Sequence, residues 1–229
     1  MNSRRVEKAR PADLAVAIVV LGTLWGFSEV VLGGLLGASG IPYRAAVLTG
    51  IGMGLLAIGL AAYRSAWMPL GAAVVAMLCK QLVVPILHVS VACKANSCLA
   101  VGLQALALSA ILLLYGKRLH QGTPARVGGG ASAALLAAGS FYLAGLRLAP
   151  CPYLVPFSRA GGLSAFLVAE VLPWAVASVV LFPIGYLLGE RLARTTLAVR
   201  LKPRLYYLAS VAIMASSWAA RAFAVSAGL

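Results

Sequence analysis

The stretch LWGFSEVVLGGLLG, residues 24–37, places the carboxylate of Glu29 inside an otherwise apolar run. The run shows no strand-like alternation of polar and apolar residues, which argues against a β-barrel. It belongs to an apolar block at 13–38, and a helix of about 20 residues crosses the roughly 30 Å hydrocarbon core of a bilayer. The stretch therefore predicts a membrane-spanning helix that carries a charged group at depth.

Composition places the rest of the chain in the same setting. Hydrophobic residues make up 62% of the 229 residues and charged residues only 10%, and the mean hydropathy is +0.97. Soluble domains carry about a quarter charged residues, so the composition excludes an ordinary soluble protein. We expect an all-α polytopic transmembrane helix bundle that forms one integral membrane domain over residues 1–229. Its six core spans are predicted at 13–38, 45–62, 66–91, 97–115, 127–146 and 163–188, with a seventh candidate at 205–225.

The 19 lysines and arginines predict the orientation of the bundle. Thirteen of them lie before the first span or in connections on the same side, at 1–10, 64, 117–126 and 191–204. Since cytoplasmic connections are enriched in Lys and Arg, the N-terminus is expected on the cytoplasmic side of a bacterial or archaeal cytoplasmic membrane. The expected partner of these charges is the anionic lipid bilayer. Nucleic acid is not expected, because no basic face is interleaved with exposed aromatic residues.

Four polar side chains inside the predicted spans are expected at a similar depth. A rise of about 1.5 Å per residue places Glu29, Lys80, Gln104 and Glu170 in the outer half of the bilayer. Polar groups are costly there and typically mark a functional site or pair with one another. Two interpretations are open. Either the four residues line a polar pocket that opens outward, or one of the two carboxylates pairs with Lys80 and holds helices together.

Aromatic residues flank both carboxylates at helical spacing. Trp25 lies four residues before Glu29, and Phe166 and Trp174 lie four residues on either side of Glu170. Residues at this spacing share a helix face. Trp25 and Trp174 are therefore expected to form walls of the pocket, where aromatic rings beside carboxylates suit a flat or cationic ligand. In the alternative interpretation they only anchor helices at the membrane interface.

The two longest outer connections are candidates for a lid over the pocket. They carry Lys94, Asn96, Arg147, Tyr153 and Arg159 among many turn-forming residues. Lys94 and Asn96 are expected to lie in an outer gate and to contact the ligand. The same residues also suit plain surface loops.

Small residues indicate where helices approach one another closely. Gly22 and Gly26 form one pair at a spacing of four, and Gly33 and Gly37 form a second pair further along the same span. Such pairs allow two helix backbones to pack tightly in a membrane. They are expected to face a neighbouring helix of the same chain or a partner subunit.

Cysteines near the outer face raise two further hypotheses. Cys93, Cys98 and Cys151 lie close to His88 at the predicted outer ends of the spans. A cluster of three cysteines and one histidine would suit zinc or another soft metal, but the Cys-x4-Cys spacing is not specific. The alternative is a disulfide that joins Cys151 to Cys93 or Cys98 in an oxidising exterior. We expect no resident metal and no cofactor, since no pair of histidines is available inside the membrane for haem.

Catalytic motifs are missing from the sequence. It contains no phosphate-binding loop, no Gly-x-Ser-x-Gly elbow and no His-Glu-x2-His zinc site. The chain is therefore expected not to be an enzyme and not to hydrolyse a nucleotide itself.

Three stretches, taken together, resemble a known family. They are LGTLWGFSEVVLGGLLGASGIPYRAAVLTGIGMGLLAIG at 21–59, CKQLVVP at 79–85 and KANSCLAVGLQALAL at 94–108. Their order is similar to that in bacterial membrane proteins related to the substrate-binding S components of energy-coupling factor (ECF) transporters. The resemblance covers about the first 115 residues. Position by position it singles out Trp25, Gly26, Glu29, Lys80, Lys94, Asn96 and Gln104.

The resemblance implies a six-helix protein that captures a vitamin, a cofactor precursor or a metal ion outside the cell. A transmembrane coupling subunit and two ATPase subunits would then drive its release inward. The chain departs from the family in two respects: Gly22-x3-Gly26 stands where an Ala-x3-Ala surface usually meets the coupling subunit, and the segment 205–225 is an addition. A second hypothesis therefore stays open, that of a non-catalytic membrane anchor or scaffold subunit in a larger membrane complex.

Overall fold

Helices form all the regular structure in the part of the chain that the structure describes. The structure, a computed structural model, describes residues 11–82, 84, 91–151, 153–195 and 203–227, of which the side chains at 91–94, 194–195 and 203–206 are not described. No strand occurs within these ranges, which confirms the predicted all-α bundle. Six of their helices are long and apolar enough to cross a membrane, and a seventh is a shorter apolar helix.

The described helices follow the chain as seven rods. The first rod is continuous and consists of α1 (Pro11–Phe27), the π-helical turn η1 (Ser28–Leu32) and α2 (Gly33–Ala38). It is followed by α3 (Arg44–Tyr63), α4 (Met68–Gln81), α6 (Val91–Leu119) and α7 (Thr123–Leu148). The 3-10 turn η2 (Val155–Ser158) leads to a second interrupted rod, which consists of α8 (Gly162–Phe166), the π-helical turn η3 (Leu167–Val171) and α9 (Leu172–Thr195). The last rod is α11 (Pro203–Ser226), so the seventh candidate is a helix.

The bounds of the predicted spans differ from those of the observed helices, most of all for the third and the fourth span. The span predicted at 66–91 ends too late, because α4 ends at Gln81 and Val91 already belongs to α6. Residues 83 and 85–90 lie outside the described residues. The span predicted at 97–115 lies within α6, which extends six residues further at its start and four residues further at its end. Hydropathy detects only the apolar middle of a helix, and α6 is polar at both ends.

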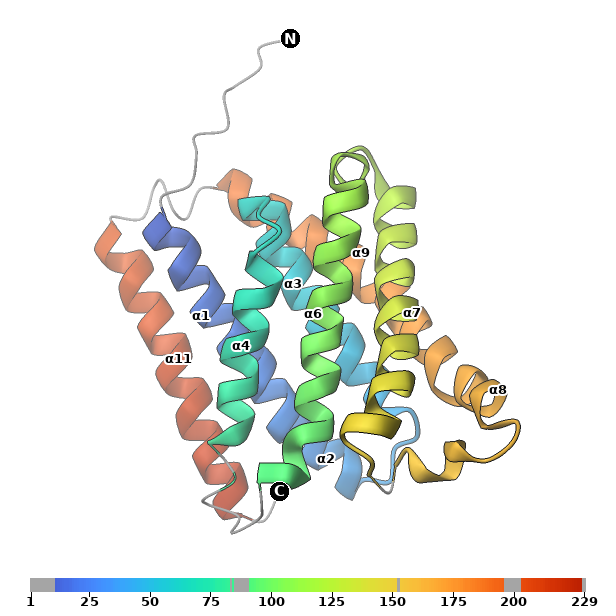
Figure 1. Ribbon diagram of the computed structural model, residues 1–229. Coiled ribbons are helices and arrows are strands. Elements are labelled where there is room, and N and C mark those ends of the chain that lie inside the picture. Colours follow the sequence, from blue (N-terminus) through green and yellow to red (C-terminus); the bar gives the residue numbers. More distant parts are fainter. Residues whose placement is uncertain (1–10, 83, 85–90, 152, 196–202, 228–229) are drawn as a thin grey trace.

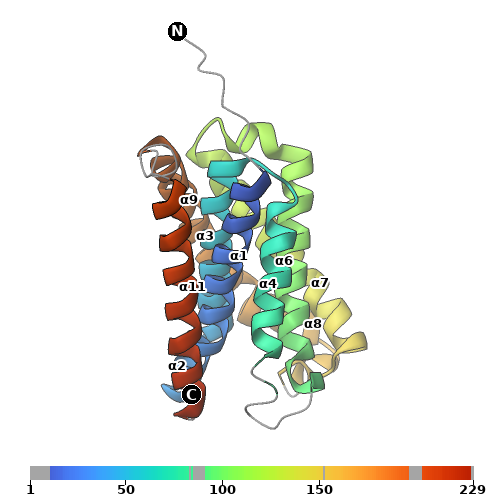
Figure 2. The same ribbon diagram turned by 90° about the vertical axis from the view of Figure 1, so that its left-hand side faces the viewer.

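Six rods form a closed ring, and α11 packs outside it. In order around the ring, the neighbours are α1, α4, α6, α7, α9 and α3, and α3 returns to α1. Both views of the bundle show α11 beside α1 on the outer side (Figures 1 and 2). The main apolar core lies between the ring helices and includes Met53, Leu56 and Phe182. Within the described residues, the seventh rod is therefore an addition to a complete six-rod ring.

The two ends of the bundle differ in charge. We call the end at which α1 begins the N-terminal face, and the end at which α3 begins the opposite face; successive rods alternate in direction between them (Figure 1). Apart from the buried Lys80 and Arg221, the arginines and lysines with described side chains at or near the N-terminal face are Arg64, Lys117, Arg118, Arg126 and Arg191, and those near the opposite face are Arg44, Arg147 and Arg159. Basic residues are thus more numerous at the N-terminal face, as in the sequence-based argument for the orientation. That this face lies in the cytoplasm stays a prediction.

Glycines set the closest helix contacts in the ring. A Cβ atom on Gly22 would lie 2.6 Å from the carbonyl oxygen of Ala72, and one on Gly26 would lie 2.6 Å from the Cβ of Cys79. The predicted Gly22-x3-Gly26 surface is therefore used inside the fold, against α4. The second predicted pair lies in α2 and faces the start of α3: a Cβ on Gly33 would be 3.3 Å from the side chain of Leu48, and one on Gly37 would be 2.9 Å from that of Arg44.

A tighter glycine contact between α3 and α9 is missing from the sequence predictions. A Cβ on Gly185 would lie 2.1 Å from the carbonyl oxygen of Gly54, which no side chain can tolerate. Gly50 and Gly189 extend the same contact by one turn on each helix. The sequence contained a signal for this contact, since Gly50 and Gly54 on α3 and Gly185 and Gly189 on α9 each have the small-x3-small spacing.

Two π-helical turns interrupt the rods, and each contains a membrane carboxylate. In η1 the amide of Gly33 donates to the carbonyl of Ser28, and in η3 the amide of Leu172 donates to that of Leu167, so each bond spans five residues. Pro173 lies two residues after the end of η3, and its ring would clash with the carbonyl of residue 169 in a regular helix. Such turns are rare overall, and many of those that occur lie at functional sites. Glu29 and Glu170 are therefore candidates for functional residues.

Candidate functional site

Glu29 is the carboxylate that pairs with Lys80. Their side chains come from η1 and α4, and the Nζ atom of Lys80 lies 2.7 Å from Oε2 of Glu29. The side chain of Lys80 is 5% exposed and that of Glu29 is 9% exposed, so the ion pair is nearly enclosed. Of the two open interpretations, this geometry matches a contact that joins helices. Ligand binding by Glu29 or Lys80 stays a prediction.

Gln104 and Trp25 are also enclosed in the bundle. The amide nitrogen of Gln104 donates to the hydroxyl of Thr49 over 3.1 Å, which links α6 to α3. Trp25 is fully buried with its indole against Gly52, where an added Cβ would lie 2.5 Å from the indole nitrogen. The carbonyl oxygen of Gln104 and the indole nitrogen of Trp25 have no hydrogen-bond partner among the described residues. Unpaired polar atoms are costly to bury, so both remain able to bind a polar group.

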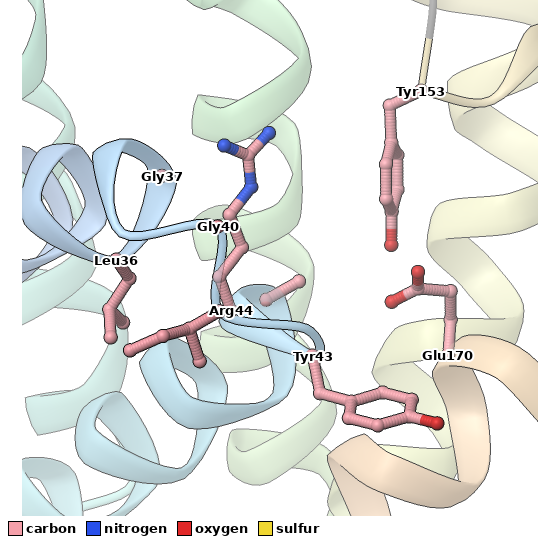
Figure 3. A pocket seen from close by; sticks show the side chains of 9 residues that line it. Leu36, Gly37, Gly40, Tyr43, Arg44, Tyr153 and Glu170 are labelled. Atoms are coloured by element: carbon pink, nitrogen blue, oxygen red, sulfur yellow. The ribbon is translucent and has the colours of Figure 1, made fainter.

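A pocket of about 280 Å³ lies at the opposite face, where the turn between α2 and α3 approaches η3 (Figure 3). Of the residues predicted to line a polar pocket, it contains Glu170 and not Glu29, Lys80 or Gln104. Its described lining consists of Leu36, Gly37, Gly40, Ile41, Tyr43, Arg44, Ala45, Tyr153 and Glu170. The lining of this pocket thus includes Glu170 without the three polar residues that were expected beside it, and a shared ligand site for all four stays a prediction.

Glu170 is the unpaired carboxylate of this pocket. Its Oε2 atom is enclosed and has no full hydrogen-bond partner, and no described cation forms an ion pair with it. The hydroxyl of Tyr153 points toward the carboxylate (Figure 3), although the two groups do not reach full hydrogen-bonding geometry. Burial, and then the neighbouring carboxylate of Glu170, raises the pKa of Tyr153 above its usual value. The phenol therefore keeps its proton and remains a donor at this site.

An aromatic cluster packs behind Glu170. The ring of Trp174 stacks on that of Phe141, with centroids 5.8 Å apart, and Phe166 contacts Tyr142 and Phe157 at 5.0 and 5.2 Å. Trp174 is buried, and its indole nitrogen has no hydrogen-bond partner in the described ranges. The cluster holds η3 in place against α7 and the outer connection. It gives Glu170 an apolar surrounding on one side and the pocket on the other.

Backbone strain marks the other wall of the pocket. Tyr43 has a φ angle of 60°, in the left-handed region that bulky side chains rarely adopt, and Gly40 has a φ angle of 62°. At a bulky residue such as Tyr43 this conformation costs about 1–3 kcal/mol and is typical of ligand-binding sites, whereas a glycine adopts it without strain. The two residues turn the chain sharply enough to start α3 at the pocket, with Arg44 as its first residue. Arg44 is exposed and takes part in no described ion pair.

The predicted gate residues are only partly described. Lys94 lies in the first turn of α6, and its side chain is outside the described residues. Asn96 donates to the carbonyl of Ala149 over 2.9 Å and so binds the start of α6 to the end of α7. Neither belongs to the described lining of the pocket. Their role in a gate stays a prediction.

The cysteine hypotheses receive no support from the described residues. Cys98 and Cys151 are free thiols, and the amide of Gln81 lies 3.3 Å from the sulfur of Cys98. Within the described part of the chain, no group of three metal-binding side chains occurs. His88 and the side chain of Cys93 lie outside it.

A second polar network lies near the N-terminal face. Arg126 of α7 forms two hydrogen bonds to the carboxylate of Glu190, at 2.8 and 3.3 Å, and a third to the carbonyl of Leu119. Its guanidinium lies 4.2 Å from the ring centre of Tyr186, whose hydroxyl bonds to His120. The sequence predictions did not include this network. The four side chains tie the turn between α6 and α7 to α9.

Arg221 anchors the seventh rod. It is only 3% exposed, and its Nη1 atom donates to the carbonyl of Cys79 over 3.0 Å, where α4 approaches its end. Basic side chains often satisfy the last carbonyls of a helix. The ring of Trp218 covers the guanidinium at 4.9 Å. α11 is thus attached to α4 as well as to α1.

Comparisons with known proteins leave the family open. No protein-family model, no curated protein and no solved structure matches this chain. The resemblance to the S components stays an expectation, and the function has to be argued from the site.

Proposed function

We propose that this chain is the membrane-embedded substrate-binding subunit of an ATP-driven importer of the ECF type, and that it captures a small molecule from outside the cell. The observation that carries the proposal is the pocket at the opposite face with the unpaired carboxylate of Glu170 in its wall. A protein that only had to hold helices together would gain nothing from such a group. Burial of an unpaired charge is costly unless water or a ligand binds it.

The position of the pocket supports capture from outside. The basic residues gather at the N-terminal face, and the positive-inside rule assigns that face to the cytoplasm. The pocket lies at the other end of the bundle, which faces the exterior in this orientation. Its strained turn and its unpaired polar atoms are typical of a ligand site.

The helix packing bears on how a coupling subunit would bind. Gly22 and Gly26 are covered by α4, so they offer no free small-residue surface to a partner. α11 covers another part of α1. In our proposal the coupling subunit therefore binds another side of the ring, and the extra rod restricts which sides are open.

Copurification tests the proposal. The full chain, with a C-terminal tag, is isolated from its own membranes in a mild detergent, and its partners are identified by mass spectrometry. We expect nucleotide-binding ATPase subunits and a further polytopic membrane subunit. Recovery of redox or other catalytic subunits instead, with no ATPase, would contradict the proposal.

The anchor or scaffold hypothesis rests on a different observation. Two ion pairs, Lys80 with Glu29 and Arg126 with Glu190, are satisfied inside the chain and stabilise helix contacts without a ligand. An anchor needs only such contacts. Since it requires no bound small molecule and no ATPase, the same copurification separates the two functions.

A further inference from the structure

The charges in the pocket indicate the class of its ligand. Arg44 and Glu170 are the ionised side chains of the described lining, one cationic and one anionic. Tyr43 and Tyr153 add two phenol groups, and the remaining side chains are apolar. The described lining thus has no net charge but carries two opposite poles.

Neither pole is neutralised inside the protein. The ion pairs among the described residues join Lys80 to Glu29 and Arg126 to Glu190, and neither Arg44 nor Glu170 takes part in them. The lack of a cationic partner matters most for Glu170, because one of its oxygens is enclosed and, in the described lining, only the neutral hydroxyl of Tyr153 is directed at the carboxylate (Figure 3). A bound group of positive charge would offset the cost of this carboxylate.

The two poles belong to different walls of the pocket. Arg44 begins α3 after the strained turn, whereas Glu170 lies in η3 on another rod. Figure 3 shows the guanidinium and the carboxylate on separate sides, with the Tyr153 hydroxyl directed at the carboxylate. A molecule that bridges the pocket can therefore contact both charges at once.

We propose that the pocket binds a small zwitterion, whose cationic group pairs with Glu170 and whose anionic group pairs with Arg44. This inference rests on the proposed function and adds the substrate class. A zwitterion pairs both charges, whereas an ion of either sign alone would leave Arg44 or Glu170 without a partner. The volume of about 280 Å³ lies at the lower end for ligand pockets, which suits a molecule of amino-acid size.

Three probes with the same apolar body test the proposal: L-phenylalanine is a zwitterion, phenethylamine a cation and 3-phenylpropionate an anion. Their affinities for the purified full chain are measured by isothermal titration calorimetry. We expect L-phenylalanine to bind at least about tenfold more tightly than either ion, since a hydrogen bond to a charged group contributes about 1.5–3 kcal/mol.

Single substitutions then assign the two poles. In Glu170→Gln, L-phenylalanine should bind no better than 3-phenylpropionate, because the cationic group has lost its partner. In Arg44→Gln it should bind no better than phenethylamine. Arg159→Gln removes a positive charge at the same face outside the described lining, and it should keep the preference of the parent. Circular dichroism and size-exclusion chromatography verify that each variant is folded.

Two results would overturn the zwitterion proposal. One is a parent protein that does not prefer L-phenylalanine over both ions, and the other is a preference that survives both pocket substitutions. Neither result depends on copurified ATPases. If ATPases copurify and the chain releases a bound molecule without opposite charges, the importer proposal stands and the ligand class is wrong.

Discussion

The ion pair between Lys80 and Glu29 joins α4 to the first rod at a depth where either charge alone is unfavourable. The two groups lie 2.7 Å apart and are nearly enclosed. Removal of one partner from a buried pair costs about 3–5 kcal/mol, because the other charge is left uncompensated, whereas replacing both with apolar residues is often neutral. The pair is therefore a sensitive test of whether these residues hold helices or bind a ligand.

We predict that Glu29→Gln lowers the free energy of unfolding by about 3 kcal/mol, measured by denaturant titration in detergent. The double variant Glu29→Leu with Lys80→Met should recover most of this loss, because neither charge remains. Probe affinity at the Glu170 pocket should stay unchanged in the double variant. A stable Glu29→Gln protein that no longer binds ligand would instead assign Glu29 to the binding site.

The sequence left open whether Lys80 pairs with a carboxylate or lines a pocket, and it did not indicate which carboxylate would be the partner. The choice depends on which helices are neighbours: α1 packs against α4, while η3 packs against α7. No local pattern contains this information. Arg44 was missed as a pocket residue for a similar reason, since a single arginine at the start of a helix is common, and only the strained turn before it brings it to the pocket.

At the level of elements, α3 and α9 show the closest approach of a glycine to the backbone of another helix in the described ring. Gly185→Ala should destabilise the protein by about 1–3 kcal/mol, because its Cβ would overlap the carbonyl of Gly54. Gly139→Ala on α7 is the matched control, since a Cβ there meets no atom within 4 Å. The control should be neutral or stabilising by up to about 1 kcal/mol. Equal unfolding temperatures for the two variants would show that the helices are not packed as described.

The turn between α6 and α7 should respond to pH through His120. Burial, and then the positive charges of Arg64 and Arg126, lower the pKa of His120, while Glu190 opposes them; its ring also bonds to Tyr186. The unfolded chain therefore binds the proton at a higher pH than the folded one. Stability is complete above the usual histidine pKa of about 6.5 and falls as the pH drops through it toward the folded pKa.

We accordingly expect the unfolding temperature of the parent to decrease between about pH 7.5 and about pH 5.5. His120→Gln should reduce this decrease, because glutamine does not titrate and can still bond to Tyr186. His88→Gln, at the only other histidine of the chain, provides the control. An identical pH dependence of the parent and His120→Gln would contradict the lowered pKa.

The π-helical turns show where prediction of elements from sequence ends. Apolar blocks predicted the rods because each rod must bury its backbone bonds and expose apolar side chains to lipid. The same blocks contain no residue pattern that predicts η1; the only local feature is the pair of glycines that follows this turn. At η3, Pro173 is a visible cause, but its effect on the hydrogen bonds depends on packing against α7. The π-helical conformation at Glu29 and Glu170 could therefore not be predicted from the sequence and is known only from the structure.

At the level of the whole molecule, the charge difference between the two faces predicts the orientation in the membrane. A chain truncated after Gln121 and fused to green fluorescent protein should be fluorescent, and its fusion to alkaline phosphatase should be inactive. Truncation after Arg159 should give the reverse pattern, since this residue lies near the pocket face. The opposite pattern at both positions would place the pocket in the cytoplasm and exclude capture from outside.

Release of a bound small molecule from the purified full chain tests the proposed capture function most directly. Native mass spectrometry compares the parent with Glu170→Gln and with Arg159→Gln, the control outside the described lining. We predict that the parent and Arg159→Gln carry one molecule of the same mass, and that Glu170→Gln has lost it while still folded. Absence of any bound molecule from the parent, or equal occupancy in all three proteins, would contradict a binding site at Glu170.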